Sequence, residues 1–553
     1  MKRNVIFIMN DSLRRDHVNA YGDPAPWPRL GREGEPFIRT PNLDRLAQSS
    51  ALFDRAYIAS YPTVPNRTDL ITGRYGFTTR GWQPLEPEDV ILPEVVKPHG
   101  YTSALMFDTP PMGADDYNFT RGFDAWFWAR GQHADRYITD PRIPTPVPAD
   151  RHKVRGWDAT KRYLRNQAER RYERDYIAPR TIGAAMDWLE DNATRDGFVL
   201  WVDTWDPHEP FDPPPHYLRM YAEPGYDGQV LIYPEYGRGE YMTDAERNHV
   251  RALYAGEVTM VDTWVGYLLD TVERLGLLDN TLIIHTSDHG HLFGDHDLQG
   301  KPGGQLGTLF EPTTRIPLMV RHPDGLGAGQ RIAPIVQPPD ILPTVLDFLG
   351  VPIPPSVQGG SILPLLRGEE ERLRERAFSG RYPQGPFYAP LARAFDGFAG
   401  ADRVTEPLTV TTEEWALICA PAPWPSRLYN LTQDPGQTRN VIDAYPEVAG
   451  DLNRDLIAFL ESYGSPADYV AKFRWPPATT GAAATEGDVA LFTIRDRTGR
   501  RIAFPTRAEA ETCVIPGAAE PAVEETTLHA LTRQDPRALV HIYGQYYRAE
   551  ELA

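Results

Sequence analysis

Short runs of apolar residues alternate along this chain with longer stretches that carry a helical pattern. Apolar runs that end in turn signals are typical of buried strands. The stretches between them repeat apolar residues at helical spacing, and one ends at Gly350, a common C-terminal cap. The candidate strands are 4–9, 102–107, 198–204, 281–287 and 317–322, and the candidate helices are 180–193, 246–276, 340–350 and 446–464.

This alternation predicts an α/β fold, in which helices flank both faces of a largely parallel sheet. In such sheets, ligands bind beyond the carboxyl ends of the strands. Three candidate strands are followed by polar residues at this end, at 10–12, 203–208 and 287–289. We therefore expect these three segments to converge on one edge of the sheet and to form a site there.

The length of 553 residues predicts more than one lobe. Two stretches, 130–178 and 210–245, lack periodicity, and we interpret them as long loops that either shape a substrate site or are plain surface excursions. The predicted division is a catalytic α/β domain over 1–390, a small C-terminal sheet-plus-helix subdomain over 391–465 and a C-terminal extension over 466–553.

Composition and charge narrow the choice of partners. A net charge of −19 argues against nucleic acid and anionic membranes, although a local cationic pocket could still take a small anion. The two cysteines lie far apart, which predicts free thiols and suits a reducing compartment. No run approaches the ~18 apolar residues that span a bilayer, and the apolar start is too short for a signal peptide. We therefore expect a cytoplasmic protein.

Asp288 and His289 follow one candidate strand directly, and Asp11 follows another. Carboxylates and imidazoles are common ligands of divalent metals. A single Asp-His pair is weak support, because a surface turn explains most such pairs. The presence of Asp11, Arg67 and Lys301 in the same chain favours a metal site.

The stretch SYPTVPNRTDL places Thr63 at a predicted helix start, one turn before Arg67. A hydroxyl becomes a good nucleophile when a metal lowers its pKa. The helix N-terminus and the guanidinium favour a tetrahedral oxyanion such as phosphate or sulfate. The alternative is that Thr63 only caps the helix.

Four segments now carry a family resemblance. T-x-P-x-R-x-x-x-x-T-G-R-Y at 63–75 resembles the sulfatase signature, C/S-x-P-x-R followed by T-G. Residues 6–22 resemble the opening strand of that family, 286–302 its metal segment and active-site lysine, and 427–441 its C-terminal L-Y-D-L motif. Over residues 4–465 the chain is thus identified as a member of the sulfatase family in the alkaline phosphatase superfamily. The resemblance implies a sulfatase-type α/β core with a smaller C-terminal sheet.

The resemblance also implies roles for single residues. One divalent metal, Mn²⁺ or Ca²⁺ before Zn²⁺ or Mg²⁺, would be bound by four ligands: Asp11, Thr63, Asp288 and His289. Thr63 would also be the nucleophile. The transferred group would be held by Arg67 and Lys301, and His208 would contact the substrate or protonate the leaving group. Members of the family are often dimers or tetramers, so a homo-oligomer remains open.

Three departures from the family pattern modify the expected reaction. Sulfatases oxidise Cys or Ser to formylglycine, and Thr63 cannot yield that aldehyde. Ser12 stands where the family has a second aspartate, as in the branch that resembles phosphonate monoester hydrolases and phosphodiesterases. The family's G-K-W-H segment, whose lysine and histidine help to hold sulfate, is replaced by residues 107–110. Asp108 or Thr109 would take the place of these cations. We therefore include Thr109 among the substrate-binding candidates.

Together these features predict a metal-dependent hydrolase of phosphate diesters or phosphonate monoesters that works through a covalent threonine intermediate. A small anionic ester would be the substrate. Two alternatives remain: a sulfatase that acts without formylglycine, and a non-catalytic member of the family that binds an anion.

Overall fold

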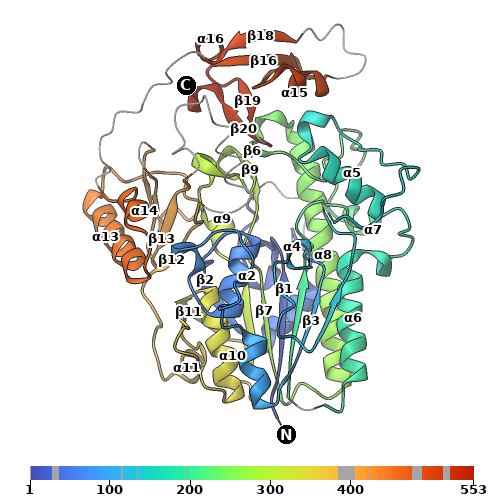
Figure 1. Cartoon of the computed structure of the whole chain (residues 1–553), viewed down its shortest axis with the longest axis vertical. Helices are drawn as coiled ribbons and strands as arrows, with labels where there is room; N and C mark the ends of the chain where they lie inside the picture. Colours follow the sequence, from blue (N-terminus) through green and yellow to red (C-terminus); the bar gives the residue numbers. More distant parts are fainter. Residues whose placement is uncertain are drawn as a thin grey trace.

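In a computed structural model, the chain forms a large central sheet, a small C-terminal sheet and a third sheet at the end opposite the N-terminus (Figure 1). The predicted domain boundary at residue 390 lies outside the described residues. The structure describes residues 2–27, 37–113, 116–133, 135–195, 197–383, 405–421, 424–475, 489–514, 523–542 and 544–552.

The central sheet confirms the predicted α/β class. β1 lies inside it, flanked by parallel strands on both sides. Ile6 and Ile8 of β1 pack into one hydrophobic core, whereas Val5, Phe7 and Met9 pack into the core on the other face. Burial on both faces explains why this strand is a continuous apolar run. In spatial order the strands are β11 (Arg331–Val336), β2 (Ala51–Ala56), β10 (Leu318–Arg321), β7 (Thr281–Thr286), β1 (Asn4–Asn10), β5 (Phe198–Thr204), β3 (Thr102–Phe107) and β4 (Ala125–Trp128).

The apolar pattern predicted the five strands β1, β3, β5, β7 and β10 but missed β2, β4 and β11. The three missed strands lie at or beside the sheet edges. An edge strand has an unpaired side, so its sequence is less continuously apolar; Pro334 within β11 is typical of that position. β10 is an antiparallel member of the sheet, paired with both β7 and β2.

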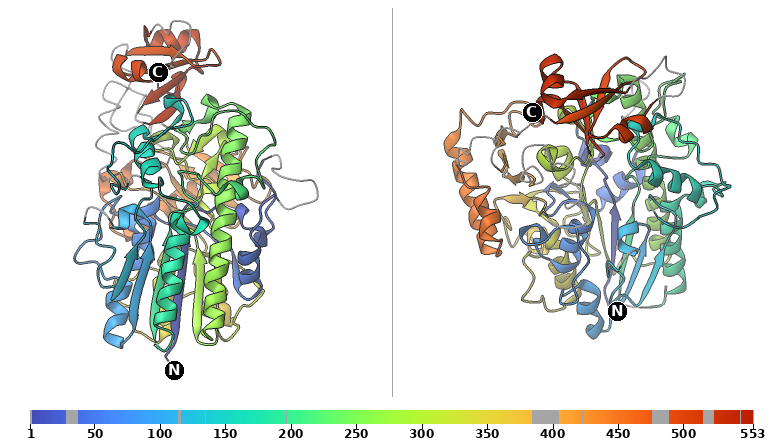
Figure 2. Two further views of the ribbon diagram at one scale, coloured as in Figure 1. Left: turned by 90° about the vertical axis from the view of Figure 1, so that its right-hand side faces the viewer. Right: turned by 45° about the horizontal axis from the view of Figure 1, so that its top comes forward.

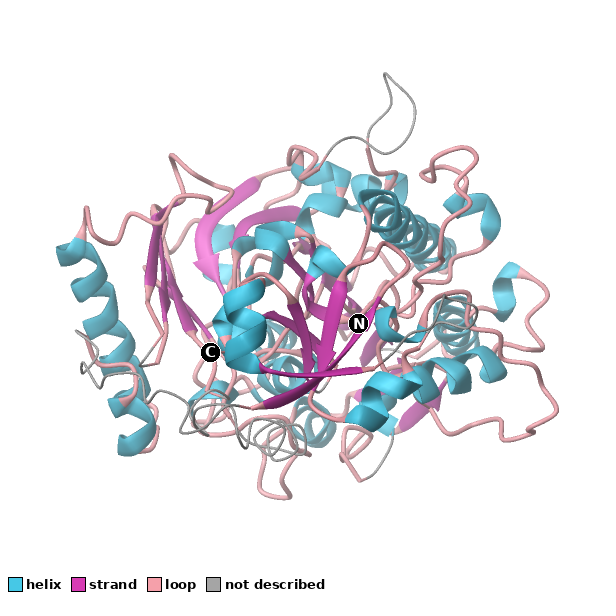
Figure 3. Ribbon diagram, turned by 90° about the horizontal axis from the view of Figure 1, so that it is seen from above, coloured by secondary structure: helices cyan, strands magenta, loops and turns pink. Residues whose placement is uncertain are grey.

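Helices cover both faces of the central sheet, as seen from the side in Figure 2 and from above in Figure 3. One face carries α6 (Ile177–Asp191) and α8 (Asp244–Arg274), and the other carries α2 (Thr63–Thr72) and α10 (Ile341–Leu349). α8 begins with a capping box between Thr243 and Glu246. Shorter helices are α1 (Pro41–Gln48), α3 (Leu92–Val96), α4 (Pro110–Gly113), α5 (Trp157–Asn166), α7 (Pro215–Leu218), α9 (Glu311–Thr314) and α11 (Leu363–Arg367).

The small C-terminal sheet is antiparallel, and the predicted helix at 446–464 packs against it as α13 (Pro446–Ser462). α14 (Ala467–Ala471) follows. Cys419 and Cys513 are free thiols, as predicted. Among the described residues no helix is long and apolar enough to cross a membrane. The strands of the small sheet are β12 (Ala377–Ser379), β13 (Leu408–Thr411), β14 (Trp415–Cys419) and β15 (Arg427–Asn430).

The third sheet joins the C-terminal extension to loops that precede and follow α8. β6 comes from the stretch 210–245, which was interpreted as a loop and also contains α7; the stretch 130–178 likewise contains α5. Helices α15 (Arg507–Thr512) and α16 (Leu528–Gln534) accompany the sheet. Its strands are, in order, β18 (Glu524–Thr527), β16 (Ala490–Arg495), β17 (Arg501–Phe504), β19 (Leu539–Ile542), β20 (Gln545–Arg548), β6 (Tyr236–Arg238), β9 (Leu298–Gly300) and β8 (Leu292–Phe293).

Candidate active site

The ends of β1, β5 and β7 meet at one edge of the central sheet, as the sequence predicted. Asp11 follows β1 directly, and its N–H donates to the carbonyl of Thr204 at the end of β5 (2.9 Å). Asp288 comes two residues after β7 and accepts a hydrogen bond from the Ser12 N–H on Oδ1 (2.9 Å). The backbone beyond the strands thus brings carboxylates together that are far apart in sequence.

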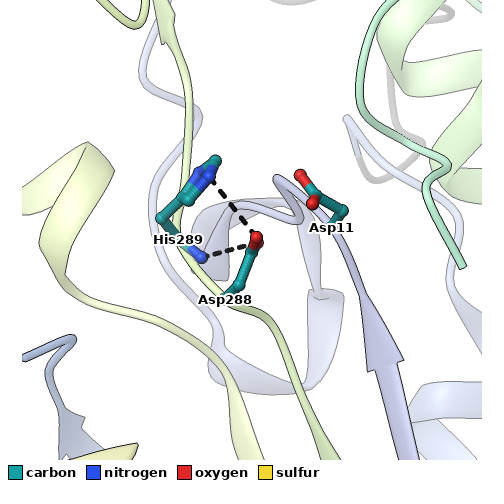
Figure 4. A group of neighbouring side chains, drawn as sticks. All are labelled: Asp11, Asp288 and His289. Atoms are coloured by element: carbon teal, nitrogen blue, oxygen red, sulfur yellow. Dashed lines mark hydrogen bonds and ion pairs between the residues drawn. The ribbon is translucent and has the colours of Figure 1, made fainter. Parts of the chain in front are cut away.

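Asp11, Asp288 and His289 form a fully buried cluster, which we call the carboxylate–histidine cluster (Figure 4). Their ligand atoms all lie within 4.8 Å of one another. His289 Nδ1 lies 2.8 Å from the Gly290 carbonyl, so Nδ1 carries the proton and Nε2 keeps its lone pair. Asp11 Oδ2 and His289 Nε2 are buried without a hydrogen-bond partner. Both atoms have only ion-pair contacts, Asp11 Oδ2 with Arg67 Nη1 (3.1 Å) and His289 Nε2 with Asp288 Oδ2 (3.4 Å). Buried carboxylate and imidazole atoms without hydrogen-bond donors fit a divalent cation.

The electrostatics of the cluster are dominated by burial. Burial, reinforced by the neighbouring Asp288, raises the pKa of Asp11 well above its usual value. Burial would also raise the pKa of Asp288, but His289 and Arg67 outweigh it and hold that pKa below the usual range. Burial lowers the pKa of His289 to about 4, so the ring is neutral near pH 7. A bound cation would relieve the repulsion between the two carboxylates.

Thr63 is the first residue of α2 and is 2% exposed. The N-cap position belongs to Pro62, so the alternative that Thr63 merely caps the helix is wrong. Asn66 donates through Nδ2 to the backbone carbonyl of Asp288 (2.7 Å), and Arg67 Nη1 bonds both the Thr63 carbonyl (3.2 Å) and Asp288 Oδ2 (2.7 Å). These bonds tie the start of α2 to the cluster.

Arg67 is fully buried and its donors are engaged by carboxylates. It forms a bidentate pair with Asp203 at 2.9 Å and 2.8 Å, and Nη1 lies 3.1 Å from Asp11 Oδ2. The guanidinium therefore holds the ligands of the cluster, and its contact with the transferred group stays a prediction. Thr109 Oγ1 donates to the same Asp203 (2.5 Å), which therefore organises both predicted residues. In the sequence, the position of Asp203 at the end of a candidate strand was the signal that could have identified it as a residue of the site.

Lys301 lies in a second group, together with His208 and the buried Glu209. Its Nζ donates to Glu209 Oε2 (2.8 Å), and the Tyr236 hydroxyl donates to Oε1 of the same carboxylate. Lys301 Nζ also lies 3.4 Å from Ser12 Oγ, which in turn donates to Asp11 Oδ1 (2.8 Å). Ser12 therefore connects the lysine to the carboxylate–histidine cluster.

Glu209 is the charged centre of this second group. Burial opposes its ionisation, but His208 and Lys301 outweigh burial and hold its pKa well below the usual value. Burial lowers the pKa of His208 well below its usual value, so this ring is neutral near pH 7. His208 Nδ1 lies 2.6 Å from the Glu209 backbone carbonyl. Sequence reasoning missed Glu209, although it directly follows His208 in DPHEPF.

The sequence is similar to known proteins over most of the chain. The sequence model of the family Sulfatase matches residues 3–351, and that of N-sulphoglucosamine sulphohydrolase, C-terminal, matches 307–461. The N-acetylglucosamine-6-O-sulfatase of Bacteroides thetaiotaomicron is 27% identical over 66% of this chain and 71% of the relative. The multifunctional alkaline phosphatase superfamily protein PehA of Trinickia caryophylli is 28% identical over 66% of this chain and 77% of the relative.

Solved structures share the fold. The phosphonate monoester hydrolase of Agrobacterium radiobacter superposes with a TM-score of 0.64 at 24% identity, covering 84% of this chain and 96% of that one. A structure in complex with its substrate D-glucosamine-2-N,6-O-disulfate superposes with a TM-score of 0.62 at 20% identity, covering 85% and 99%. The Sulfatase model covers more than half of the chain, and this protein therefore belongs to the sulfatase family and is a hydrolase of ester bonds.

Proposed function

We propose that this hydrolase cleaves phosphate diesters or phosphonate monoesters, with Thr63 as the nucleophile. The observation that carries the proposal is the attachment of the start of α2, where Thr63 lies, to the carboxylate–histidine cluster. Arg67 and Asn66, on the same helix, bond to Asp288 and hold the helix start beside it. A hydroxyl beside a metal site at a helix N-terminus is suited to attack an oxyanion.

The divalent metal would be bound by Asp11, Asp288 and His289, with Thr63 as a further ligand. It would supply Lewis-acid activation of the Thr63 hydroxyl and of an ester oxygen. The imidazole nitrogen among the donors favours Mn²⁺ over Ca²⁺, which prefers oxygen ligands. Zn²⁺ and Mg²⁺ are the alternatives for a metal panel.

In the first step, Thr63 Oγ1 attacks phosphorus and its proton passes to solvent. The bond from phosphorus to the leaving oxygen breaks, and the alkoxide takes up a proton from solvent. The Lys301 ammonium, held by Glu209, donates to a non-bridging oxygen and stabilises its charge. A covalent phospho-threonine or phosphonyl-threonine ester results.

In the second step, water attacks phosphorus and expels the Thr63 oxygen. Neutral His208 donates through Nδ1 to the Glu209 carbonyl, which leaves Nε2 free to accept the proton of that water. The proton then returns to Thr63. Because burial lowers the pKa of His208, its ring is neutral near pH 7 and can accept a proton, whereas the predicted role as an acid toward the leaving group needs the protonated ring.

Charge selects the substrate class. The two cations predicted to hold the transferred group are paired, Arg67 with Asp203 and Asp288, and Lys301 with Glu209. A site whose cations are balanced by carboxylates suits a monoanion better than a dianion. Phosphate diesters and phosphonate monoesters are monoanionic, whereas phosphate monoesters carry nearly two charges at neutral pH.

A sulfatase without formylglycine is the second candidate, because a sulfate monoester is also a monoanion and several relatives are sulfatases. Threonine cannot expel sulfate by re-forming an aldehyde. Water would have to attack sulfur in a threonyl sulfate. The ratio of sulfate to diester turnover separates the two candidates.

The first test is a substrate panel on protein loaded with Mn²⁺, Ca²⁺, Zn²⁺ or Mg²⁺. It compares a nitrophenyl phosphate diester, a phenylphosphonate ester, a phosphate monoester and a sulfate monoester. Thr63→Val should lower kcat by about 10³-fold or more, since it removes the nucleophile and keeps the shape. Thr68→Val, on the same helix, is the matched control and should retain activity. Full activity in Thr63→Val would refute the mechanism, and a preference for sulfate would support the second candidate.

A further inference from the structure

The last hairpin of the chain, β19–β20, docks beside the loop that carries Lys301. β20 pairs in parallel with β6, with Gln545 opposite Tyr236 and Tyr546 opposite Gly237. β6 in turn pairs with β9, whose last residue, Gly300, precedes Lys301. Figure 1 shows these strands side by side at the end of the molecule that carries the C-terminus. The extension is therefore continuous with the lysine loop through one sheet.

A direct hydrogen bond from the hairpin holds the loop that carries Lys301. The Gly303 N–H donates to Gln545 Oε1 at 2.6 Å, two residues after Lys301. Gln545 is only 5% exposed, so this bond is protected from water. Because the donor is a backbone group, its acceptor fixes the path of the chain and hence where the lysine side chain starts.

A second connection reaches the carboxylate partner of Lys301. Arg155 donates to the Gly544 carbonyl, and its guanidinium lies 4.0 Å from the ring centre of Tyr236. The Tyr236 hydroxyl donates to Glu209, which accepts from Lys301. The hairpin thus contacts the backbone two residues after the lysine directly and reaches its counter-ion, Glu209, through Arg155 and Tyr236.

The junction between β6 and β20 is fitted closely. Gly237 has a φ of 89°, a conformation that favours glycine. A Cβ on Gly237 would lie 2.2 Å from the Tyr546 carbonyl oxygen, so a side chain would separate the two strands. Tyr546 and Tyr547 are fully buried. A loosely attached tail would need neither the glycine nor the buried tyrosines.

We propose that the β19–β20 hairpin is part of the active site and that Gln545 is a positioning residue for Lys301. The inference rests on the proposed function in one respect, the role of Lys301 toward the transferred group. The hairpin lies beyond residue 461, where the matches to the two family models end. It therefore lies outside the residues matched by the family models, whereas Lys301 lies inside them.

The experiment compares three variants of the full-length, metal-loaded protein. Gln545→Met removes the acceptor at nearly constant shape, and Gln545→Glu keeps an acceptor oxygen at the same position. Gln534→Met is the control for the same substitution at an exposed position of the extension, where Gln534 accepts from Arg501 Nη1 (3.0 Å). Hydrogen–deuterium exchange of the peptide that contains Gly303 and steady-state kinetics on the best substrate of the panel are measured for each variant.

We expect faster exchange at Gly303 in Gln545→Met and a fall of about ten-fold in kcat/KM, carried mainly by kcat. Gln545→Glu should recover most of both losses, and Gln534→Met should match the parent protein. Unchanged exchange in Gln545→Met, or unchanged kcat with faster exchange, would overturn the inference. If the parent protein hydrolyses no ester, the proposed function fails, and the exchange result alone decides whether Gln545 fixes the loop.

Discussion

The two halves of the candidate site are held in place by different means. The first half consists of the carboxylate–histidine cluster with Thr63 and Arg67. Its residues come directly after strands of the central sheet or at the start of a buried helix. The second half consists of Lys301, Glu209 and His208, which lie in loops and are supported by the third sheet.

This difference suggests different consequences of mutation. In the first half, Arg67 joins three buried carboxylates, so the site and the fold share the same interactions. In the second half, Gly303 is bonded to a residue 242 positions away, and the loop can shift while the central sheet stays intact. We expect damage to the first half to cost stability and activity together, and damage to the second half to cost mainly activity.

The largest effect is expected for Arg67→Met. It leaves Asp203, Asp288 and Asp11 buried without their cation, and breaking such a network costs about 3–5 kcal/mol. Denaturant unfolding of the metal-free protein measures this cost. Arg331→Met, on the edge strand β11 and paired with Asp54 at the surface, is the control and should change stability by less than about 0.5 kcal/mol. Equal stability of the two variants would remove the distinction between the halves.

A smaller effect, confined to activity, is expected for Glu209→Gln. It keeps the shape but removes the charge that orients Lys301, so kcat/KM should fall about 10–100-fold. Glu246→Gln is the matched control, since Glu246 forms a buried pair with Lys153 outside the site. The distance between Lys153 Nζ and Glu246 Oε1 is also 2.8 Å. That control should lose stability and keep kcat/KM. A loss of activity in both variants would mean that any buried pair matters equally.

The effect that is smallest near neutral pH, because it develops only in acid, concerns the acid sensitivity of the central sheet. Burial lowers the pKa of His285 on β7 to about 3, whereas an unfolded histidine titrates near 6.5. The unfolded state therefore binds the proton first, and stability should fall by about 1.4 kcal/mol per pH unit below pH 6.5 until about pH 3. In His285→Gln the slope of unfolding free energy against pH should be smaller by about one proton. An unchanged slope would show that His285 does not contribute to acid unfolding.

The sequence by itself determined the core strands and the residues of the first half. Strands buried on both faces are continuous apolar runs, and polar residues directly after them share one sheet edge because parallel strands end together. Asp11, Asp288 and His289 could therefore be predicted to meet, and they do. Their metal and the catalytic role of Thr63 stay predictions.

Only the tertiary structure decided the environment of each predicted side chain. The sequence did not reveal that Arg67 is saturated by carboxylates, that Glu209 is the partner of Lys301, or that Gln545 lies beside the lysine loop. The edge strand β11 and its neighbour β2 escaped prediction for a related reason, since their pairing depends on neighbours remote in sequence. The local pattern of apolar residues predicts which face of a helix or strand is buried. Contacts between loops depend on how elements remote in sequence pack together, and a local pattern does not predict that packing.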